Sequence, residues 1–290
     1  MNPRLSATTT LCGVFGDPVK HSISPALHNK GFEKADLDYA YLAFTADEGT
    51  IGQSMDAVRT LGMRGASITA PNKIAVMQYL DEVDPTAQAI GAVNTVVNRD
   101  GYLTGYNTDG FGFLQGFANM GVEIKGGKMV LLGLGGAGGS VAYTAAMDCG
   151  LAELVVFNRA GGKSWGHAEE VVARINEQTG CKARLCDLND KELLKAEMAT
   201  AQMLANTTTV GMGAQEGMSP VPDSSYFPAG MAVQDAIYRP AETELLRLAR
   251  EAGCKTSNGL TMLFYQGARA FEYWTGQQMP LTVDDLEIAG

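Results

Sequence analysis

A glycine-rich stretch near the middle of the chain constrains the fold more than any other feature. An apolar run at 129–132 ends in glycines with the spacing G-x-G-x-x-G, which are Gly133, Gly135 and Gly138, and a helical pattern continues to about residue 149. In a strand–turn–helix unit the first glycine permits the tight turn, the second lets the backbone approach a pyrophosphate, and the third lets the helix pack on the strand. The stretch therefore predicts a dinucleotide-binding unit, with the pyrophosphate on the N–H groups of the helix N-terminus.

Basic residues after the next predicted strand, 154–157, bear on the choice of dinucleotide. Sites that prefer NAD commonly carry Asp or Glu at this strand end, where it binds the ribose 2′-hydroxyl. This chain has Asn158 and Arg159 instead, and then Lys163 beyond two glycines. Because Arg and Lys can bind a 2′-phosphate, the pattern favours NADP over NAD. The alternative interpretation is that both cations are solvated charges at a helix start.

A later predicted strand of this half, 203–205, opens into the polar run Asn206-Thr207-Thr208-Thr209. Helices expected at about 164–179 and 191–199 alternate with the strands, as in a parallel sheet. Doubly wound folds bind ligands at the carboxyl ends of their strands. The polar run therefore predicts contact with the nicotinamide side of the cofactor.

About the first hundred residues predict a separate α/β unit. Ser24 followed by Pro25 is typical of a helix start, with Ser24 as N-cap and the proline in the first helical position. The hydroxyls of Ser22 and Ser24 would also suit a carboxylate, because free N–H donors and the helix dipole favour an anion there. The alternative is a helix cap without a ligand.

Four further polar residues stand out. Lys73 is expected at the start of a helix, where its charge opposes the helix dipole. Asn94 places an amide inside an apolar strand, and Asp109 lies where the next helix begins. Gln266 falls within the apolar stripe of a helix expected at 259–274. Each also has a structural interpretation, as a solvated lysine, a buried amide or an N-cap.

Composition excludes several classes of function. A formal charge of −10 argues against nucleic acid or an anionic membrane surface as partner. The five cysteines form no C-x-x-C pair and there are only three histidines, so we expect no metal site and reduced thiols. No apolar run approaches the roughly 20 residues of a membrane helix, and a signal-peptide h-region is lacking. We expect a cytoplasmic protein of two domains, given its 290 residues.

Taken in chain order, these segments and several others resemble the shikimate dehydrogenase family, including its quinate/shikimate dehydrogenase branch. The resemblance covers essentially the whole chain. It is carried by His21-Ser22-x-Ser24-Pro25, Thr69-x-Pro71-x-Lys73, Gly91-Ala92-Val93-Asn94-Thr95, Asn107-Thr108-Asp109, the glycine loop, Asn158-Arg159, Asn206-x-Thr208-x-x-Gly211-Met212, Tyr238 and Gly259-x-x-Met262-Leu263-x-x-Gln266.

The resemblance implies an α/β fold of two domains. A substrate-binding catalytic domain would comprise residues 1–110 and be completed by C-terminal helices in 258–290, and a Rossmann NAD(P)-binding domain would occupy 111–257. The implied reaction is the reversible NAD(P)-dependent reduction of 3-dehydroshikimate to shikimate by a monomer or homodimer. Two alternatives stay open: a quinate/shikimate dehydrogenase that also uses 3-dehydroquinate and quinate, and a nucleotide-binding sensor without turnover.

The resemblance also assigns roles to residues. Lys73 would act as acid and base, with Asp109 as its partner. The implied substrate-binding residues are Ser22, Ser24, Ser67, Thr69, Asn94, Tyr238 and Gln266. The implied cofactor-binding residues are Gly133, Gly135, Gly136, Ala137, Gly138, Asn158, Arg159, Lys163, Thr208, Met212 and Gly259.

Two positions depart from the family pattern. Ser67 stands where the family usually has Asn, which shortens one polar arm near the substrate and leaves room for quinate. Ala160 stands where NADP-dependent members usually offer Thr or Ser to the 2′-phosphate, so NAD stays open as a second cofactor. Both departures concern preference rather than reaction type.

Overall fold

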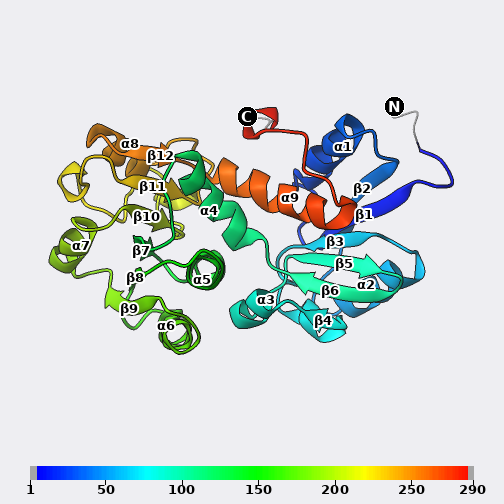
Figure 1. Ribbon diagram of the computed structural model, residues 1–290, viewed down its shortest axis with the longest axis horizontal. Coiled ribbons are helices and arrows are strands. Elements are labelled where there is room, and N and C mark those ends of the chain that lie inside the picture. Colours follow the sequence, from blue (N-terminus) through cyan, green and yellow to red (C-terminus); the bar gives the residue numbers. More distant parts are fainter. Residues whose placement is uncertain (1–4, 287–290) are drawn as a thin grey trace. The chain divides into compact units, whose positions relative to one another are not determined.

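The structure is a computed structural model, and it describes residues 5–286. The chain divides into two compact units (Figure 1). Unit 1 contains the residues up to Thr108 and those from Gln266 onward, and unit 2 is Asp109–Tyr265. The second boundary falls inside a helix rather than ahead of it, so 258–265, expected in the substrate domain, belong by their contacts to unit 2.

Unit 1 is built on a six-stranded mixed sheet in the order β2-β1-β3-β5-β6-β4. Its strands are β1 (Thr10–Gly16), β2 (Tyr39–Thr45), β3 (Gly65–Ile68), β4 (Glu82–Val83), β5 (Thr95–Arg99) and β6 (Tyr102–Tyr106). β1 pairs in parallel with both β2 and β3, whereas β5 is antiparallel to β3 and to β6. The β5–β6 turn has positive φ at Asp100 and Gly101, the backbone that a two-residue hairpin of this sequence requires.

Both faces of this sheet are covered. Along β1, Cys12 and Val14 belong to one hydrophobic cluster, and Leu11 and Phe15 belong to another. This alternation is the period of a strand buried on both sides. The remaining elements of the unit are α1 (Ser24–Lys34), α2 (Ile51–Thr60), a 3₁₀ helix (Ala75–Tyr79), α3 (Pro85–Ile90) and the C-terminal 3₁₀ helix (Val283–Asp285).

Unit 2 has the architecture that the glycine stretch predicts. Its six strands are all parallel, in the order β12-β11-β10-β7-β8-β9. They are β7 (Lys128–Leu132), β8 (Glu153–Asn158), β9 (Lys182–Asp187), β10 (Met203–Asn206), β11 (Ala232–Asp235) and β12 (Lys255–Ser257). Counted along the chain this is the doubly wound order 3-2-1-4-5-6, and its switch point lies between β7 and β10, where such folds bind ligands.

The helices of unit 2 connect these strands. They are α4 (Asp109–Asn119), α5 (Gly136–Tyr143), a π-helical turn (Thr144–Asp148), α6 (Trp165–Gln178), α7 (Lys191–Met198) and α8 (Glu244–Glu251). The last long helix, α9 (Gly259–Thr275), starts in unit 2 and ends in unit 1. In the part of the chain that is described, no helix combines the length and apolarity that crossing a membrane requires.

Two local predictions in unit 1 are wrong. Ile23, not Ser24, is the N-cap of α1, and Ser24 is the first helical residue, without a side-chain capping bond. Lys73 does not begin an α-helix, because it lies in a turn that leads into the 3₁₀ helix Ala75–Tyr79. Lys73 is therefore held by a turn after β3, whereas Ser24 lies in the first turn of α1.

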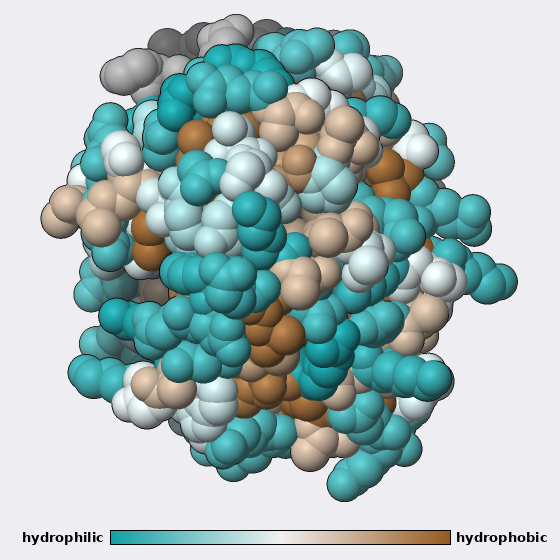
Figure 2. All heavy atoms as spheres, turned by 90° about the vertical axis from the view of Figure 1, so that its left-hand side faces the viewer, coloured by the Kyte–Doolittle hydropathy of each residue, from teal (hydrophilic) through white to brown (hydrophobic). Residues whose placement is uncertain are grey.

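Polar side chains dominate the surface of unit 2 that Figure 2 presents, and apolar ones show there in a narrow strip and in isolated spots. Single exposed apolar residues are normal on soluble domains, whereas a broad patch would signal a binding face. The face of unit 2 in this view therefore carries no broad apolar patch.

Candidate active site

A large cavity lies in unit 2, at the switch point of its sheet. It has a volume of about 720 Å³ and opens between the turn after β7, the loop after β8 and the loop after β10. Its lining residues are Gly133, Leu134, Gly135, Asn158, Arg159, Ala160, Gly161, Gly162, Lys163, Ser164, Leu188, Asn189, Thr207, Thr208, Thr209, Val210 and Gln215. A cavity of this size in this place suits a dinucleotide.

Each of the three loop positions needs glycine for a different structural reason. Gly133 adopts φ +81°, the left-handed backbone of the tight turn. A Cβ on Gly138 would lie 2.5 Å from the Gly133 carbonyl oxygen, so Gly138 is needed for close packing. A Cβ on Gly135 would meet nothing within 4 Å, because this backbone faces the open cavity. Gly135 is thus the position where a ligand can approach the chain.

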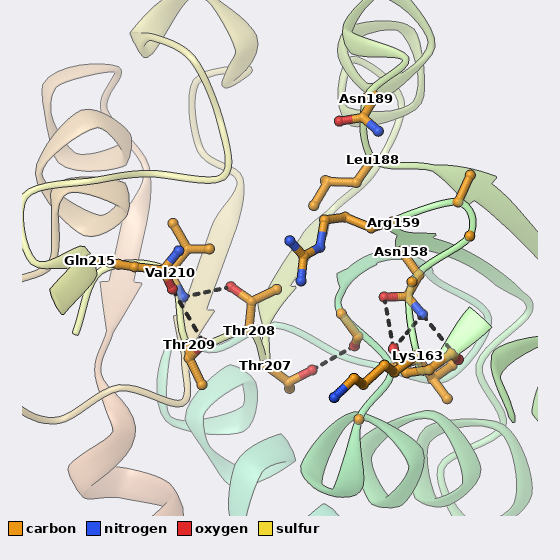
Figure 3. Close-up of a pocket in the computed structure, with 17 residues that line it drawn as sticks. Asn158, Arg159, Lys163, Leu188, Asn189, Thr207, Thr208, Thr209, Val210 and Gln215 are labelled. Carbon is orange, nitrogen blue, oxygen red and sulfur yellow. Dashed lines mark hydrogen bonds between the residues drawn. The ribbon is translucent and has the colours of Figure 1, made fainter. Parts of the chain in front are cut away.

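The loop after β8 carries the two cations that the sequence singled out. Asn158 is buried, and its amide donates to the backbone oxygen of Ser164 at 3.3 Å and to its hydroxyl at 3.1 Å. Asn158 therefore ties the loop together. Arg159 extends into the cavity in Figure 3. Within residues 5–286, neither Arg159 nor Lys163 forms an ion pair, so both charges are available to an anion.

The loop after β10 is fixed by a buried polar network. The side-chain oxygen of Asn206, Oδ1, accepts from the backbone N–H of Thr208 at 3.1 Å and from the Thr208 hydroxyl at 2.8 Å. The Asn206 amide donates to Asp235 at 3.0 Å, and Asn206 and Asp235 are both fully buried. The Thr207 hydroxyl donates to the Gly133 carbonyl oxygen at 2.7 Å, which joins this loop to the glycine turn (Figure 3).

Five predicted cofactor residues lie outside the lining set in this structure: Gly136, Ala137, Gly138, Met212 and Gly259. Met212 is exposed. Gly259 has a packing reason, because its Cβ would lie 2.0 Å from the Ala236 carbonyl oxygen and its N–H donates to Ile237 at 2.9 Å. Gly136 begins α5, so its N–H is one of the free donors of that helix end.

Unit 1 gathers hydroxyls at the strand ends near the start of α1. The backbone N–H of Ser24 donates to the Ser22 hydroxyl at 3.3 Å. The Tyr41 hydroxyl lies beside those of Ser24 and Ser67, is fully buried, and has no hydrogen-bond partner of good geometry in the described chain. Burial raises the pKa of Tyr41, so this phenol remains a protonated donor. A buried hydroxyl without a partner is costly, which marks the cluster as a place for a polar ligand.

The residues around β3 and β5 that are predicted to bind the substrate are connected by short hydrogen bonds. Asn94 is buried directly before β5. Its side-chain oxygen, Oδ1, accepts from the Thr108 N–H at 2.9 Å, and its side-chain amide donates to the Thr108 hydroxyl at 3.0 Å. The backbone oxygen of Lys73 accepts from Val93 at 2.8 Å, which brings the Lys73 turn beside Asn94. The Val93 backbone thus holds the lysine turn, and the Asn94 side chain holds Thr108, the residue that directly precedes Asp109.

The remaining predicted residues are placed within their own units. Asp109 is buried in the first turn of α4, where the helix dipole favours its negative charge. Tyr238 is 40% exposed and follows β11 in unit 2, and Gln266 is half-buried in α9 and belongs to unit 1. In the described part of the chain there is no group of three or more His, Cys, Asp or Glu side chains that could hold a metal ion.

Sequence reasoning missed Tyr41 and the wall formed by Leu188 and Asn189. Tyr41 lies inside an aromatic strand, where burial is the ordinary expectation. Leu188 and Asn189 follow a strand that carries no motif. Only the parallel pairing of β8 with β9 brings them to the cavity.

The chain matches two family models: that of the shikimate dehydrogenase substrate binding domain over residues 14–96, and that of the shikimate 5′-dehydrogenase C-terminal domain over 259–284. A Listeria monocytogenes protein named shikimate dehydrogenase (NADP+) is 41% identical over 278 residues, covering 96% of this chain and 95% of that protein.

Two solved structures show the same similarity in three dimensions. Shikimate 5-dehydrogenase from Listeria monocytogenes, in complex with shikimate and NAD, has a TM-score of 0.93 at 41% identity, covering 98% of this chain and 97% of that one. The enzyme from Thermus thermophilus, in complex with NADP(H) and shikimate, has a TM-score of 0.77 at 37% identity, covering 93% of this chain and 95% of that one.

Proposed function

Because this chain belongs to the shikimate dehydrogenase family, we propose that it interconverts shikimate and 3-dehydroshikimate with NADP, using Lys73 and Asp109 as its acid–base pair. The observation that carries the proposal is the cavity at the sheet switch point, which combines an open glycine turn with Arg159 and Lys163. The enzyme is an NADP-dependent oxidoreductase acting on a secondary alcohol.

The residues of unit 2 fit this cofactor. The open space over Gly135 and the N–H groups at the start of α5 suit a pyrophosphate. Arg159 and Lys163 suit a 2′-phosphate, because neither has an ion-pair partner among the described residues. When bound, NADP supplies the hydride acceptor for alcohol oxidation, or the donor in the reverse direction.

The residues of unit 1 fit the substrate. Ser22, Ser24 and the buried Tyr41 hydroxyl provide donors for the substrate carboxylate, and each can donate without losing a strong internal bond. Thr69, Asn94 and Gln266 provide further polar groups for the ring hydroxyls. A polar pocket of this kind rejects analogues that lack a matching hydroxyl, because its own groups would then be left unpaired.

Lys73 and Asp109 would handle the proton. During oxidation the substrate hydroxyl loses its proton, and the Lys73 amine would accept it. In the reverse direction the Lys73 ammonium would polarise the carbonyl oxygen and return the proton. The Asp109 carboxylate, in the first turn of α4, would orient the ammonium.

The proposed function is tested by measuring reduced cofactor formation by the purified protein for shikimate and quinate, each with NADP and NAD. We expect the highest kcat/KM for shikimate with NADP. No shikimate-dependent reduction of either cofactor at alkaline pH would contradict the function. Cofactor binding by calorimetry without any turnover would instead favour the non-catalytic sensor.

Ser67 favours quinate as a second substrate. Its hydroxyl is shorter than the amide usual in the family and lies beside the unpartnered Tyr41 hydroxyl. Quinate carries an additional ring hydroxyl, which the hydroxyls of Ser67 and Tyr41 could meet as hydrogen-bond partners. Ser67→Asn should therefore lower kcat/KM for quinate more than for shikimate. An equal change for both acids would remove this second activity from the proposal.

We also propose that the protein acts in the cytoplasm as a monomer or homodimer. Its five cysteines are all free thiols, which agrees with a reducing compartment. Light scattering after size exclusion would distinguish the two assembly states, and a larger assembly would contradict both.

A further inference from the structure

Asp187 occupies a junction at the rim of the cofactor cavity. It is the last residue of β9 and lies opposite Asn158 of β8 in the parallel register. One of its oxygens, Oδ1, accepts three hydrogen bonds: from the Ala160 N–H at 3.2 Å, from the Asn189 N–H at 3.1 Å and from the Asn189 side-chain amide at 3.2 Å. One carboxylate oxygen thus joins the loop after β8 to the loop after β9.

Both partners of Asp187 line the cavity. Ala160 follows Arg159 in the loop that also carries Lys163, and Figure 3 shows Asn189 and Leu188 near Arg159. The Ala160 position is where a hydroxyl would ordinarily meet a 2′-phosphate. Here it offers no side-chain donor, and its backbone N–H is directed to Asp187. Asp187 therefore takes up a donor that the 2′ end of the cavity would otherwise present.

The charge of Asp187 matters as well. The hydrogen bonds from Asn189 and Ala160 lower the pKa of its carboxyl group, so it is ionised at neutral pH. Across the described residues it forms no ion pair with Arg159 or Lys163. The rim of the cavity thus holds one carboxylate near two cations, and their fields oppose each other at the position of a 2′-phosphate.

We propose that Asp187 is a specificity-determining residue for the cofactor, which lowers the preference for a 2′-phosphate over a 2′-hydroxyl while holding the two walls of that end of the site. The inference rests on the proposed function, because it takes this cavity as the NADP site. It explains how a chain with Arg159 and Lys163 can still accept NAD. It also separates two properties of one side chain, the negative charge and the hydrogen-bond acceptor.

The test compares the binding of adenosine 2′,5′-bisphosphate and adenosine 5′-monophosphate by calorimetry, because these probes differ only in the 2′-phosphate. Asp187→Asn removes the charge and keeps an acceptor. It should raise the affinity ratio in favour of the bisphosphate about three- to tenfold and leave the monophosphate nearly unchanged. The gain should shrink at high salt. Asp187→Ala loses the acceptor too, and should lower the affinity for both probes.

Asp190→Asn is the matched control. Asp190 lies three residues along the same turn, where it caps α7 through the Leu193 N–H at 3.0 Å, and it does not line the cavity. It should leave the affinity ratio unchanged. A ratio that Asp187→Asn leaves unchanged or lowers, or that Asp190→Asn raises equally, would overturn the inference.

The same variants separate this inference from the proposed function. If the wild type oxidises shikimate with NADP but Asp187→Asn does not shift the probe ratio, only the role of Asp187 fails. If neither probe binds the wild type, the cavity is not the cofactor site and the proposed function fails with it. The ratio of kcat/KM for NADP to that for NAD should rise in Asp187→Asn with kcat unchanged, because the residue acts on binding rather than on the chemical step.

Discussion

The Thr243 hydroxyl donates a 2.7 Å hydrogen bond to Oδ2 of Asp235, and both residues are buried. Thr243 is also the N-cap of α8, where its oxygen accepts from Leu246, so its proton points to the carboxylate. The other oxygen, Oδ1, accepts from the Ile237 N–H and the Asn206 amide, both at 3.0 Å. The Asp235 carboxylate therefore links the loop after β10, the segment leading to Tyr238 and the start of α8.

This hub should be essential for stability. Burial raises the pKa of Asp235, and the three donors counter that rise. Asp235→Ala would leave all three donors unpaired in the interior, so we expect a loss of roughly 3 kcal/mol or more in urea unfolding at neutral pH. Thr243→Val should cost about 1–2 kcal/mol, and Thr243→Ser should restore most of it. A loss below about 0.5 kcal/mol in Asp235→Ala would contradict the hub.

Two glycines of the loop should respond oppositely to alanine. Gly135 has an ordinary backbone and open space at its Cβ, so Gly135→Ala should fold with unchanged stability but lose NADP affinity about tenfold or more. Gly138→Ala would force a Cβ to 2.5 Å from the Gly133 carbonyl oxygen, and should lower the unfolding free energy by about 1–3 kcal/mol. Calorimetry and thermal melting distinguish the two effects. Unchanged NADP affinity in a folded Gly135→Ala variant would contradict the proposal that the cofactor approaches the backbone at Gly135.

His28 should make stability depend on pH. It is fully buried against Tyr41, with ring centroids 4.4 Å apart, and burial lowers the pKa of His28 from 6.5 to about 3. The unfolded chain therefore takes up this proton first as the pH falls. The stabilisation is fully present above about pH 6.5 and is lost between there and about pH 3, at up to about 1.4 kcal/mol per pH unit.

His28→Phe is the matched variant for this prediction, because it keeps a ring against Tyr41 and cannot titrate. Between about pH 6 and 4, the slope of unfolding free energy against pH should be smaller in the variant by the equivalent of about one bound proton. Equal slopes in both proteins would show that His28 is not responsible for acid sensitivity.

Asn29 should position the hydroxyls of Ser24 and Tyr41, which we propose bind the substrate. Its amide donates to the Tyr41 carbonyl oxygen at 2.9 Å, and its own carbonyl oxygen accepts from the Tyr41 N–H at 2.8 Å. This pair fastens α1, which begins at Ser24, to the edge strand β2. Asn29→Ala should cost about 1–3 kcal/mol and raise KM for shikimate several-fold, with KM for NADP unchanged. A uniform loss of active protein without a change in KM would indicate a structural role only.

Local features of the sequence predicted the nucleotide half well. The glycine loop and the alternation of strands and helices both depend on backbone conformations that neighbouring residues determine. Short elements escaped prediction, because β4, α3 and β12 are too brief to show a period.

The site was predictable only as far as its motifs reach. Ser24 looked like an N-cap because serine before proline usually is one, yet the turn after Val19 places Ile23 in that role. Tyr41 and Asp187 carry no local signal. Their contacts with Ser67 and Ala160 come from strands and loops that are distant in the chain, so only the folded sheets bring these residues together.

The central claim is that Lys73 transfers the proton, and a single-turnover measurement tests it most directly. Wild type and Lys73→Met are mixed with saturating shikimate and NADP, and the formation of NADPH is followed, with Lys182→Met on exposed β9 as the control lysine. General acid–base catalysis contributes about 10²–10⁴-fold, so we predict a fall of at least about a hundredfold in Lys73→Met, with shikimate affinity nearly retained and the control unaffected. A Lys73→Met rate within about tenfold of wild type would contradict the account.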